Sequence, residues 1–383
     1  MNPIIIIGTG LAGFNLLKEL RKLDADRPIT LITSDDGMIY SKPMLSAGFG
    51  KEKSADDLVM ATPEKLESQY NIRVLTHTTV DGIDRDRQQV HTNQHTLDYD
   101  QLVLALGADT VKLPLTGDAT DRVFSVNDLI DYRRFREALS QDVKDVAIIG
   151  GGLIGCEFAN DLANGGFNTT LIEPQGRLMP LLLPEALSSV LESGLEALGT
   201  QFRYGHFAKA VNSTPSGRCE VVLEDGTSVE SDLVVSAVGL RPRISLAETA
   251  GLTVNRGIVV DRRLQTNDPN IFALGDCIEL ESMILPYVMP LMAGARALAK
   301  TLTGTPTEVS YGVMPVTVKT PACPLVVNPV MHSEAGDWDV EIDGLNSKAV
   351  FTSEHGKKLG YVLMGEMLKE KMSLNKDMPA ILE

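Results

Sequence analysis

The chain has 383 residues, of which 43% are hydrophobic and 22% are charged, as in ordinary soluble globular proteins. This length is enough for two or three domains. The formal net charge of −16 argues against nucleic acid or an anionic membrane as a partner. The net charge does not exclude an acidic protein partner, because docking depends on local patches of charge.

The sequence predicts neither a secretory signal nor membrane insertion. It runs from Met-Asn-Pro directly into four isoleucines, without a basic segment or a cleavage site. No apolar run reaches the roughly 18 residues that a membrane helix needs. The four cysteines lie far apart with no CxxC pair, at Cys156, Cys219, Cys277 and Cys323. This spacing fits a reducing cytoplasm, where we expect the protein, and together with the scattered histidines it predicts no metal site.

Short apolar strands alternate with amphipathic helices, which predicts an α/β fold with parallel sheets. Residues 4–7 read as a buried strand, followed by a glycine turn, a helix and a second strand at 29–33. The same unit recurs with strands at 146–149 and 169–173 and a helix that begins at Leu153. Two copies of one nucleotide-binding unit predict two nucleotide sites.

The remaining segments predict how these units are joined. Residues 111–145 contain Pro114 and Gly117 before a helical pattern, and residues 240–255 form a second crossing. From about residue 311 short strands and glycine turns indicate a small α+β domain. We therefore expect a discontinuous first domain, a second domain and a C-terminal domain, with the bounds 1–113 and 241–310, 114–240, and 311–383.

The first glycine turn reads Gly8-Thr9-Gly10-Leu11-Ala12-Gly13 between a strand and a helix. Gly8 permits the tight turn, Gly10 lets the backbone approach a pyrophosphate, and Gly13 lets the helix pack close to the strand. The N–H groups of the helix N-terminus can bind the anion. A bare structural turn is the plain alternative. After the second strand come Thr33, Ser34 and Asp35, which all remain candidates for the ribose contact.

The second turn is Gly150-Gly151-Gly152-Leu153-Ile154-Gly155, in which Gly150, Gly152 and Gly155 take the same roles. Glu173 ends the following strand, where a carboxylate accepts hydrogen bonds from an adenosine ribose and repels a 2′-phosphate, which favours NADH. A plain strand-end glutamate is the alternative. Arg177 nearby keeps NADPH open. Further on, a strand ends in Gly275 and Asp276, which can bind a pyrophosphate and a ribityl hydroxyl.

Together these elements resemble the glutathione-reductase-like pyridine nucleotide–disulfide oxidoreductases, over about residues 3–310. Residues 102–108 are similar to the family's Ala-Thr-Gly strand, with Leu106 in place of threonine, and residues 235–242 are similar to its second crossing. The resemblance implies two Rossmann-like dinucleotide-binding domains. It places FAD at the first turn with Asp276, and NADH at the second turn.

Disulfide reductases of this family carry redox cysteines soon after the second strand. Here that region reads Tyr-Ser-Lys-Pro-Met-Leu-Ser at residues 40–46, with no sulfur nucleophile. The resemblance therefore implies that the flavin gives its electrons to an external acceptor. Cys277 and Cys323 follow segments expected near the flavin, and we interpret them as two buried free thiols rather than a redox pair.

Residues 40–46 are similar to the Tyr-x-Arg/Lys-Pro-x-Leu-Ser stretch of the ferredoxin- and rubredoxin-reductase branches, and lysine points to the rubredoxin side. Residues 155–161 and 314–324 and the short C-terminal domain resemble the rubredoxin branch of alkane-oxidising bacteria. The resemblance implies rubredoxin as the partner and an alkane hydroxylase system downstream. A ferredoxin, the rubredoxin domain of a nitric-oxide-reducing flavoprotein and an NADH-sensing interaction protein remain alternatives. The oligomeric state is open, with a monomer favoured.

The resemblance also implies roles for single residues. Lys42 is expected near N5 and O4 of the flavin, where a positive charge stabilises a reduced anionic ring. Glu157 is expected to pair with Lys42 and to border the nicotinamide, and Lys319 to lie near the pyrimidine end of the flavin. Val80 and Val288 are candidates for backbone contacts to the flavin. The plain alternatives are a turn lysine, a helix-capping carboxylate, a strand-end lysine and two core valines.

Overall fold

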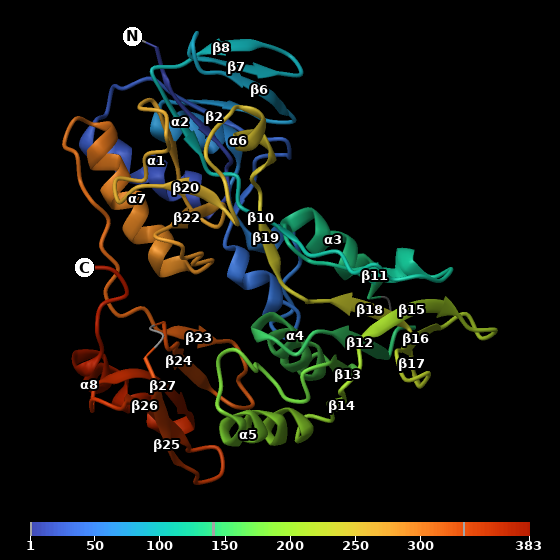
Figure 1. The fold of residues 1–383 in the computed structure, drawn as a ribbon. Helices are drawn as coiled ribbons and strands as arrows, with labels where there is room; N and C mark the ends of the chain where they lie inside the picture. The colour runs from blue at the N-terminus through green and yellow to red at the C-terminus, as the bar shows by residue number, and fades with distance from the viewer. Residues whose placement is uncertain (1, 140–141, 332–333) are drawn as a thin grey trace.

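The computed structural model describes residues 2–139, 142–331 and 334–383. In those residues two parallel sheets and one antiparallel sheet, each of five strands, form the framework. The first parallel sheet occupies the upper half of Figure 1, and the other two sheets share the lower half. The predicted α/β class with a small α+β C-terminal domain is confirmed.

The first parallel sheet has the strand order β21-β9-β1-β2-β5. Its central strand is the run of isoleucines, which is buried because the sheet is covered on both faces. The helices α1 (Leu11–Leu23) and α7 (Val288–Leu302) pack against each other and share its core. The strands are β1 (Ile4–Ile7), β2 (Ile29–Ile32), β5 (Arg73–Leu75), β9 (Gln101–Leu104) and β21 (Ile271–Ala273).

Shorter elements surround this sheet. The helix α2 (Pro63–Tyr70) begins where the Thr62 side chain accepts the Lys65 N–H and proline takes the first helical position. The other elements are β3 (Ile39–Tyr40), η1 (Lys42–Ser46), η2 (Asp56–Leu58), β4 (Val59–Ala61), β6 (Val80–Asp84), β7 (Gln89–Thr92), β8 (Thr96–Asp98), α6 (Ser245–Thr249), β20 (Ile258–Val260) and β22 (Ile278–Leu280).

The second parallel sheet repeats the architecture of the first, with the order β11-β18-β12-β13-β14. The recurrence predicted from the two glycine turns is confirmed, and the two predicted strands each begin one residue earlier than expected. The elements of this half are η3 (Thr120–Arg122), β11 (Val123–Phe124), α3 (Leu129–Ala138), β12 (Asp145–Ile149), α4 (Leu153–Asn164), β13 (Asn168–Glu173), α5 (Glu185–Glu196), β14 (Gln201–Tyr204), β15 (Ala208–Ser213), β16 (Cys219–Leu223), β17 (Ser228–Ser231) and β18 (Leu233–Ser236).

The two halves are joined by an antiparallel pair of strands, β10 (Ala108–Thr110) and β19 (Leu240–Pro242). Figure 1 shows this pair between the upper and lower halves. The chain therefore leaves the first half along one strand and returns along the other, so that strands far apart in sequence complete the first sheet.

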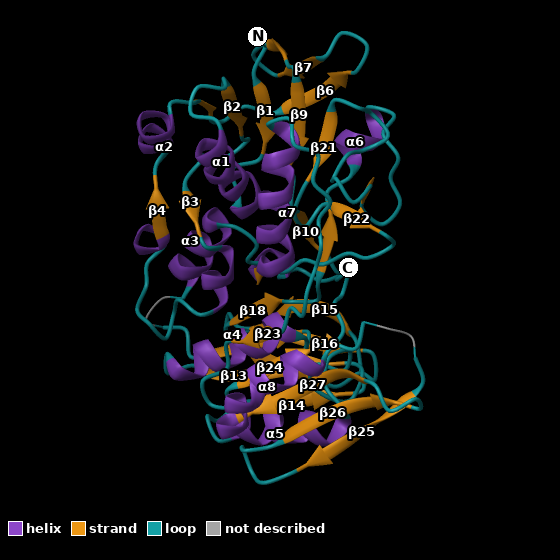
Figure 2. Cartoon of the chain, turned by 90° about the vertical axis from the view of Figure 1, so that its left-hand side faces the viewer, coloured by secondary structure: helices purple, strands orange, loops and turns teal. Residues whose placement is uncertain are grey.

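The antiparallel sheet has the order β23-β24-β27-β26-β25. It lies below the first half in Figure 2 and shares one hydrophobic core with α4 and α5 of the second half. Its elements are β23 (Val316–Val318), β24 (Leu325–Asn328), β25 (Gly336–Glu341), β26 (Lys348–Ser353), β27 (Lys358–Met364), η4 (Gly365–Glu370) and α8 (Lys371–Asp377). Among the residues described, no helix is long and apolar enough to cross a membrane.

Candidate active site

The first glycine turn has the geometry that a dinucleotide requires. Gly8 has a φ of 116°, and a Cβ there would overlap the carbonyl oxygen of Ala105. A Cβ on Gly13 would overlap the carbonyl oxygen of Gly8, so glycine is needed for the close approach of α1. Gly10 instead faces open space, and α1 begins there without a side-chain cap. The first N–H groups of α1 are therefore free to bind an anion.

The candidates after β2 are arranged around the same turn. Gly8 donates its N–H to the carbonyl of Ile32, which brings the next residues, Thr33 and Ser34, beside the turn. Thr33 is buried and donates its hydroxyl to Asp35 Oδ1 at 2.6 Å, whereas Ser34 is exposed. The Asp35 carboxylate also accepts the Gly37 N–H, so it is committed to stabilising the turn. Val80 begins β6 nearby and is half-buried against the first core.

Gly275 and Asp276 lie against this turn from the other side. Leu274 donates its N–H to the carbonyl of Leu104, and Gly275 has a φ of 88°. A Cβ on Gly275 would come within 2.8 Å of Ala12, so the two turns are in close contact. The N-terminus of α7 also lacks a side-chain cap, and its first residue, Val288, is exposed.

The second turn repeats the geometry of the first. Gly150 has a φ of 107°, a Cβ on Gly155 would overlap the carbonyl oxygen of Gly150, and Gly152 faces open space at the uncapped start of α4. The Glu173 carboxylate is buried, and it accepts the N–H groups of Gly151 and Gln175, each at 2.8 Å. Its oxygens are thus fixed beside the turn and retain lone pairs for a further donor.

Lys42 starts η1, and its Nζ lies 3.8 Å from Asp276 Oδ2. Burial lowers the pKa of Lys42, and the charge of Asp276 opposes this effect. Burial likewise raises the pKa of Asp276, opposed by the charge of Lys42. The structure therefore holds a partly buried cation beside the carboxylate that is expected to meet the flavin.

The predicted pairing of Lys42 with Glu157 is wrong. Glu157 is 0% exposed and forms its ion pair with Lys319 Nζ. Its Oε1 accepts the backbone N–H of Lys319 at 2.9 Å, and its Oε2 accepts the Ser46 hydroxyl at 2.5 Å. Lys319 directly follows β23, so a lysine of the C-terminal sheet forms an ion pair with α4. The sequence could not show this contact, because 162 residues separate its partners.

Four buried free cysteines are present, and they include Cys277 and Cys323, which were interpreted as buried free thiols. Cys277 belongs to the core of the first sheet, whereas Cys323 belongs to the core shared by α5 and the C-terminal sheet. Burial raises the pKa of both thiols to about 11. These two residues therefore form no redox pair. In the described part of the chain, no group of three or more His, Cys, Asp or Glu side chains is placed to hold a metal ion.

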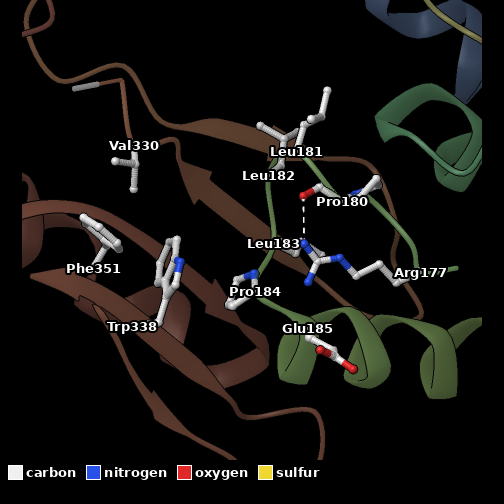
Figure 3. Close-up of a pocket in the computed structure, with 10 residues that line it drawn as sticks. All are labelled: Arg177, Pro180, Leu181, Leu182, Leu183, Pro184, Glu185, Val330, Trp338 and Phe351. Atoms are coloured by element: carbon white, nitrogen blue, oxygen red, sulfur yellow. Dashed lines mark hydrogen bonds between the residues drawn. The ribbon is translucent and has the colours of Figure 1, made fainter. Parts of the chain in front are cut away.

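A cavity of about 380 Å³ lies apart from these residues, between residues 177–185 and the C-terminal sheet. Figure 3 shows Trp338 and Phe351 on the side of the sheet and Leu183 and Pro184 facing them. The rings of Trp338 and Phe351 pack edge to face, with 5.5 Å between their centroids. Arg177, which the sequence offered as a possible contact for NADPH, lines this cavity, whereas the residues expected to bind FAD or NADH do not.

The fold and the paired glycine turns define an oxidoreductase with two dinucleotide sites, and sequence comparison gives the family. Residues 2–299 match the family model described as pyridine nucleotide-disulphide oxidoreductase, and residues 308–378 match the rubredoxin binding C-terminal domain. The chain belongs to the pyridine nucleotide-disulphide oxidoreductase family.

Particular relatives cover the whole chain. A rubredoxin-NAD(+) reductase of Alcanivorax borkumensis is 59% identical over 382 residues, covering 100% of both chains. A nitric oxide reductase FlRd-NAD(+) reductase of Vibrio vulnificus is 38% identical and covers 98% of both. The crystal structure of a covalent putidaredoxin reductase–putidaredoxin complex matches with a TM-score of 0.88 and 27% identity, covering 99% of this chain and 94% of that chain.

The residues present fit the FAD and NADH used by reductases of this family. Both glycine turns leave open space where a pyrophosphate would approach, and both lead into uncapped helix N-termini. Asp276 stands at the carboxyl edge of the first parallel sheet, which is the edge where ligands of such folds bind. The donor set thus agrees with FAD at the first turn and NADH at the second.

Proposed function

We propose that this chain is an FAD-dependent reductase that takes hydride from NADH and delivers electrons to rubredoxin. The full-length similarity to a rubredoxin-NAD(+) reductase carries this proposal. The match of residues 308–378 to a rubredoxin binding domain supports the choice of acceptor. The lack of any cysteine in residues 40–46 supports transfer to an external carrier rather than to a disulfide.

FAD, when bound, supplies the conversion of a two-electron hydride donor into single electrons for an iron protein. In this proposal Lys42 holds a positive charge near the flavin, and Asp276 accepts a ribityl hydroxyl. Glu157 orients Lys319 toward the same centre, and Glu173 accepts the adenosine ribose of NADH. Charges fixed before the reaction stabilise a reduced anionic ring without reorganisation.

The proposed domains follow the sheets: FAD binds residues 1–113 and 241–310, NADH binds residues 114–240, and residues 311–383 contribute to rubredoxin docking. The supporting observation is that each parallel sheet draws its strands from one of the first two units. We propose a cytoplasmic location, since the cysteines are free; the oligomeric state stays open, with a monomer favoured. The alkane hydroxylase system downstream rests on the resemblance of residues 314–324.

A reductase for the rubredoxin domain of a nitric-oxide-reducing flavoprotein is the second candidate. The 38% identity to the Vibrio vulnificus protein favours it over a ferredoxin reductase, but this identity is well below the 59% of the first relative. An NADH-sensing interaction protein is the candidate of another class. Such a protein would oxidise NADH slowly and without acceleration by any carrier.

Steady-state NADH oxidation with three carriers tests the choice. Isolated rubredoxin, the rubredoxin domain of a nitric-oxide-reducing flavoprotein and a ferredoxin are compared at equal concentration. We expect the highest kcat/KM with isolated rubredoxin and the lowest with ferredoxin. A higher kcat/KM with the fused rubredoxin domain would transfer the assignment to the second candidate. NADH oxidation that no carrier accelerates would contradict the reductase function.

A further inference from the structure

One face of α4 carries three buried polar side chains. Glu157, Asn160 and Asp161 stand at positions i, i+3 and i+4, so their side chains share a face of the helix. They are 0%, 1% and 7% exposed. Polar groups at this depth require partners, because an unpaired buried donor or acceptor is costly. The partners come from two distant segments, one of which ends the helix η1 that begins at Lys42, while the other begins at Lys319.

The first segment is residues 46–50, which follow Lys42 and η1. Asp161 accepts the N–H of Phe49 at Oδ2 and of Gly50 at Oδ1, at 2.8 and 2.9 Å. The Ser46 hydroxyl adds its bond to Glu157 one helical turn earlier. Hydrogen bonds to a charged acceptor are stronger than neutral ones, so Asp161 is the main anchor of this segment.

The second segment is residues 319–322, which follow β23. Asn160 Oδ1 accepts the Ala322 N–H at 3.0 Å, and Glu157 binds both the backbone and the ammonium group of Lys319. Residues 46–50 and 319–322 lie far apart in the sequence, and both are hydrogen-bonded to α4. The N-terminus of the same helix is the proposed pyrophosphate site for NADH.

We propose that Asp161 and Asn160 are positioning residues for the two lysines. Asp161 fixes the residues that directly follow η1, the helix that carries Lys42, and Asn160 fixes the segment that carries Lys319. The two anchors fix the positions of both lysines relative to α4, the helix that begins at the second dinucleotide turn. Because Coulomb energy depends on distance, a displaced lysine stabilises a reduced anionic flavin less than a fixed one. This inference rests on the proposed function, which supplies the flavin.

Two variants of the FAD-loaded protein separate the anchors. Asp161→Asn retains the volume of the side chain but places an amide N–H₂ against one of the two backbone donors. Asn160→Ala removes the acceptor of the Ala322 N–H. Matched controls are Asp118→Asn, since Asp118 accepts a backbone N–H from Ser213 at the surface, and Asn168→Ala, since Asn168 donates to Asp145 at the surface.

Hydrogen exchange followed by mass spectrometry is the first readout. Asp161→Asn is expected to speed exchange in residues 46–53 by about tenfold or more and to leave residues 319–326 unchanged. Asn160→Ala is expected to do the reverse, and neither control should change either segment. Unchanged exchange at the segment assigned to each anchor would overturn the proposal, as would equal acceleration of both segments by one variant.

The midpoint potential of the bound flavin, titrated with dithionite, is the second readout and needs neither NADH nor rubredoxin. Both variants are expected to shift it to more negative values than the controls, because a mobile lysine favours the reduced ring less. A loosened segment with an unchanged potential would assign these residues a purely structural role and refute the inference. Failure of the wild-type protein to bind FAD would instead refute the proposed function.

Discussion

The buried ion pair between Glu157 and Lys319 gives the sharpest energetic prediction. Lys319 is 27% exposed, whereas its partner is fully buried. Lys319→Met leaves the carboxylate with the Ser46 hydroxyl and one backbone N–H as donors. Removing one member of a fully buried pair costs about 3–5 kcal/mol, and the partial exposure of Lys319 places the expected loss near the lower end, at about 3 kcal/mol.

Glu157→Gln in the same background removes the stranded charge, so the double variant should be more stable than the sum of the single changes predicts. We expect a coupling energy of about 1–3 kcal/mol. The assay is urea unfolding followed by the fluorescence of Trp338, which is the single tryptophan of the chain and lies in the C-terminal sheet. Additivity of the two changes to within about 0.5 kcal/mol would refute the pair as a coupled unit.

Three further predictions address the dinucleotide turns and the thiols. Gly10→Ala should fold but lose bound FAD, whereas Gly13→Ala should fail to fold because its Cβ would overlap the backbone. Circular dichroism measures folding and flavin absorbance measures bound FAD. A Gly10→Ala protein that retains its FAD would contradict the proposed FAD site. Gly152→Ala should raise the KM for NADH by about tenfold or more at unchanged FAD content, and an unchanged KM in steady-state assays would exclude the second turn as the NADH site. Burial raises the pKa of Cys277 and Cys323 to about 11, so that about one thiol in a thousand is ionised at pH 8. A thiol reagent should therefore label these two cysteines slowly in the native protein, faster as the pH rises towards 11, and rapidly after denaturation. Fast labelling of either cysteine at pH 8 would contradict its burial.

Local patterns made much of this architecture predictable. The glycine turns constrain backbone geometry within six residues, and the isoleucine strand and the helix from Leu153 show periodicities that do not depend on distant contacts. The recurrence of the whole unit then predicted two parallel sheets. The strand bounds differed by single residues, because the ends of a strand depend on pairing with its neighbours.

Contacts between segments that are distant in the chain could not be predicted from the sequence. Glu157 was expected to pair with Lys42, but Lys319, in the loop after β23, forms the ion pair with the Glu157 carboxylate. Ser46, Asn160 and Asp161 were missed because hydroxyl, amide and carboxylate groups on a helix or a turn are usually solvated or local caps. Their partners lie in distant segments that only the folded structure brings onto α4.

The proposed function requires that electrons pass from NADH through FAD to rubredoxin. Anaerobic stopped-flow of the FAD-loaded protein tests it most directly, first against NADH and then against oxidised rubredoxin, with NADPH and ferredoxin as controls. We predict fast bleaching of the flavin by NADH and fast reoxidation by rubredoxin. Slow bleaching by NADH, or a reduced flavin that does not respond to rubredoxin, would contradict the proposed function.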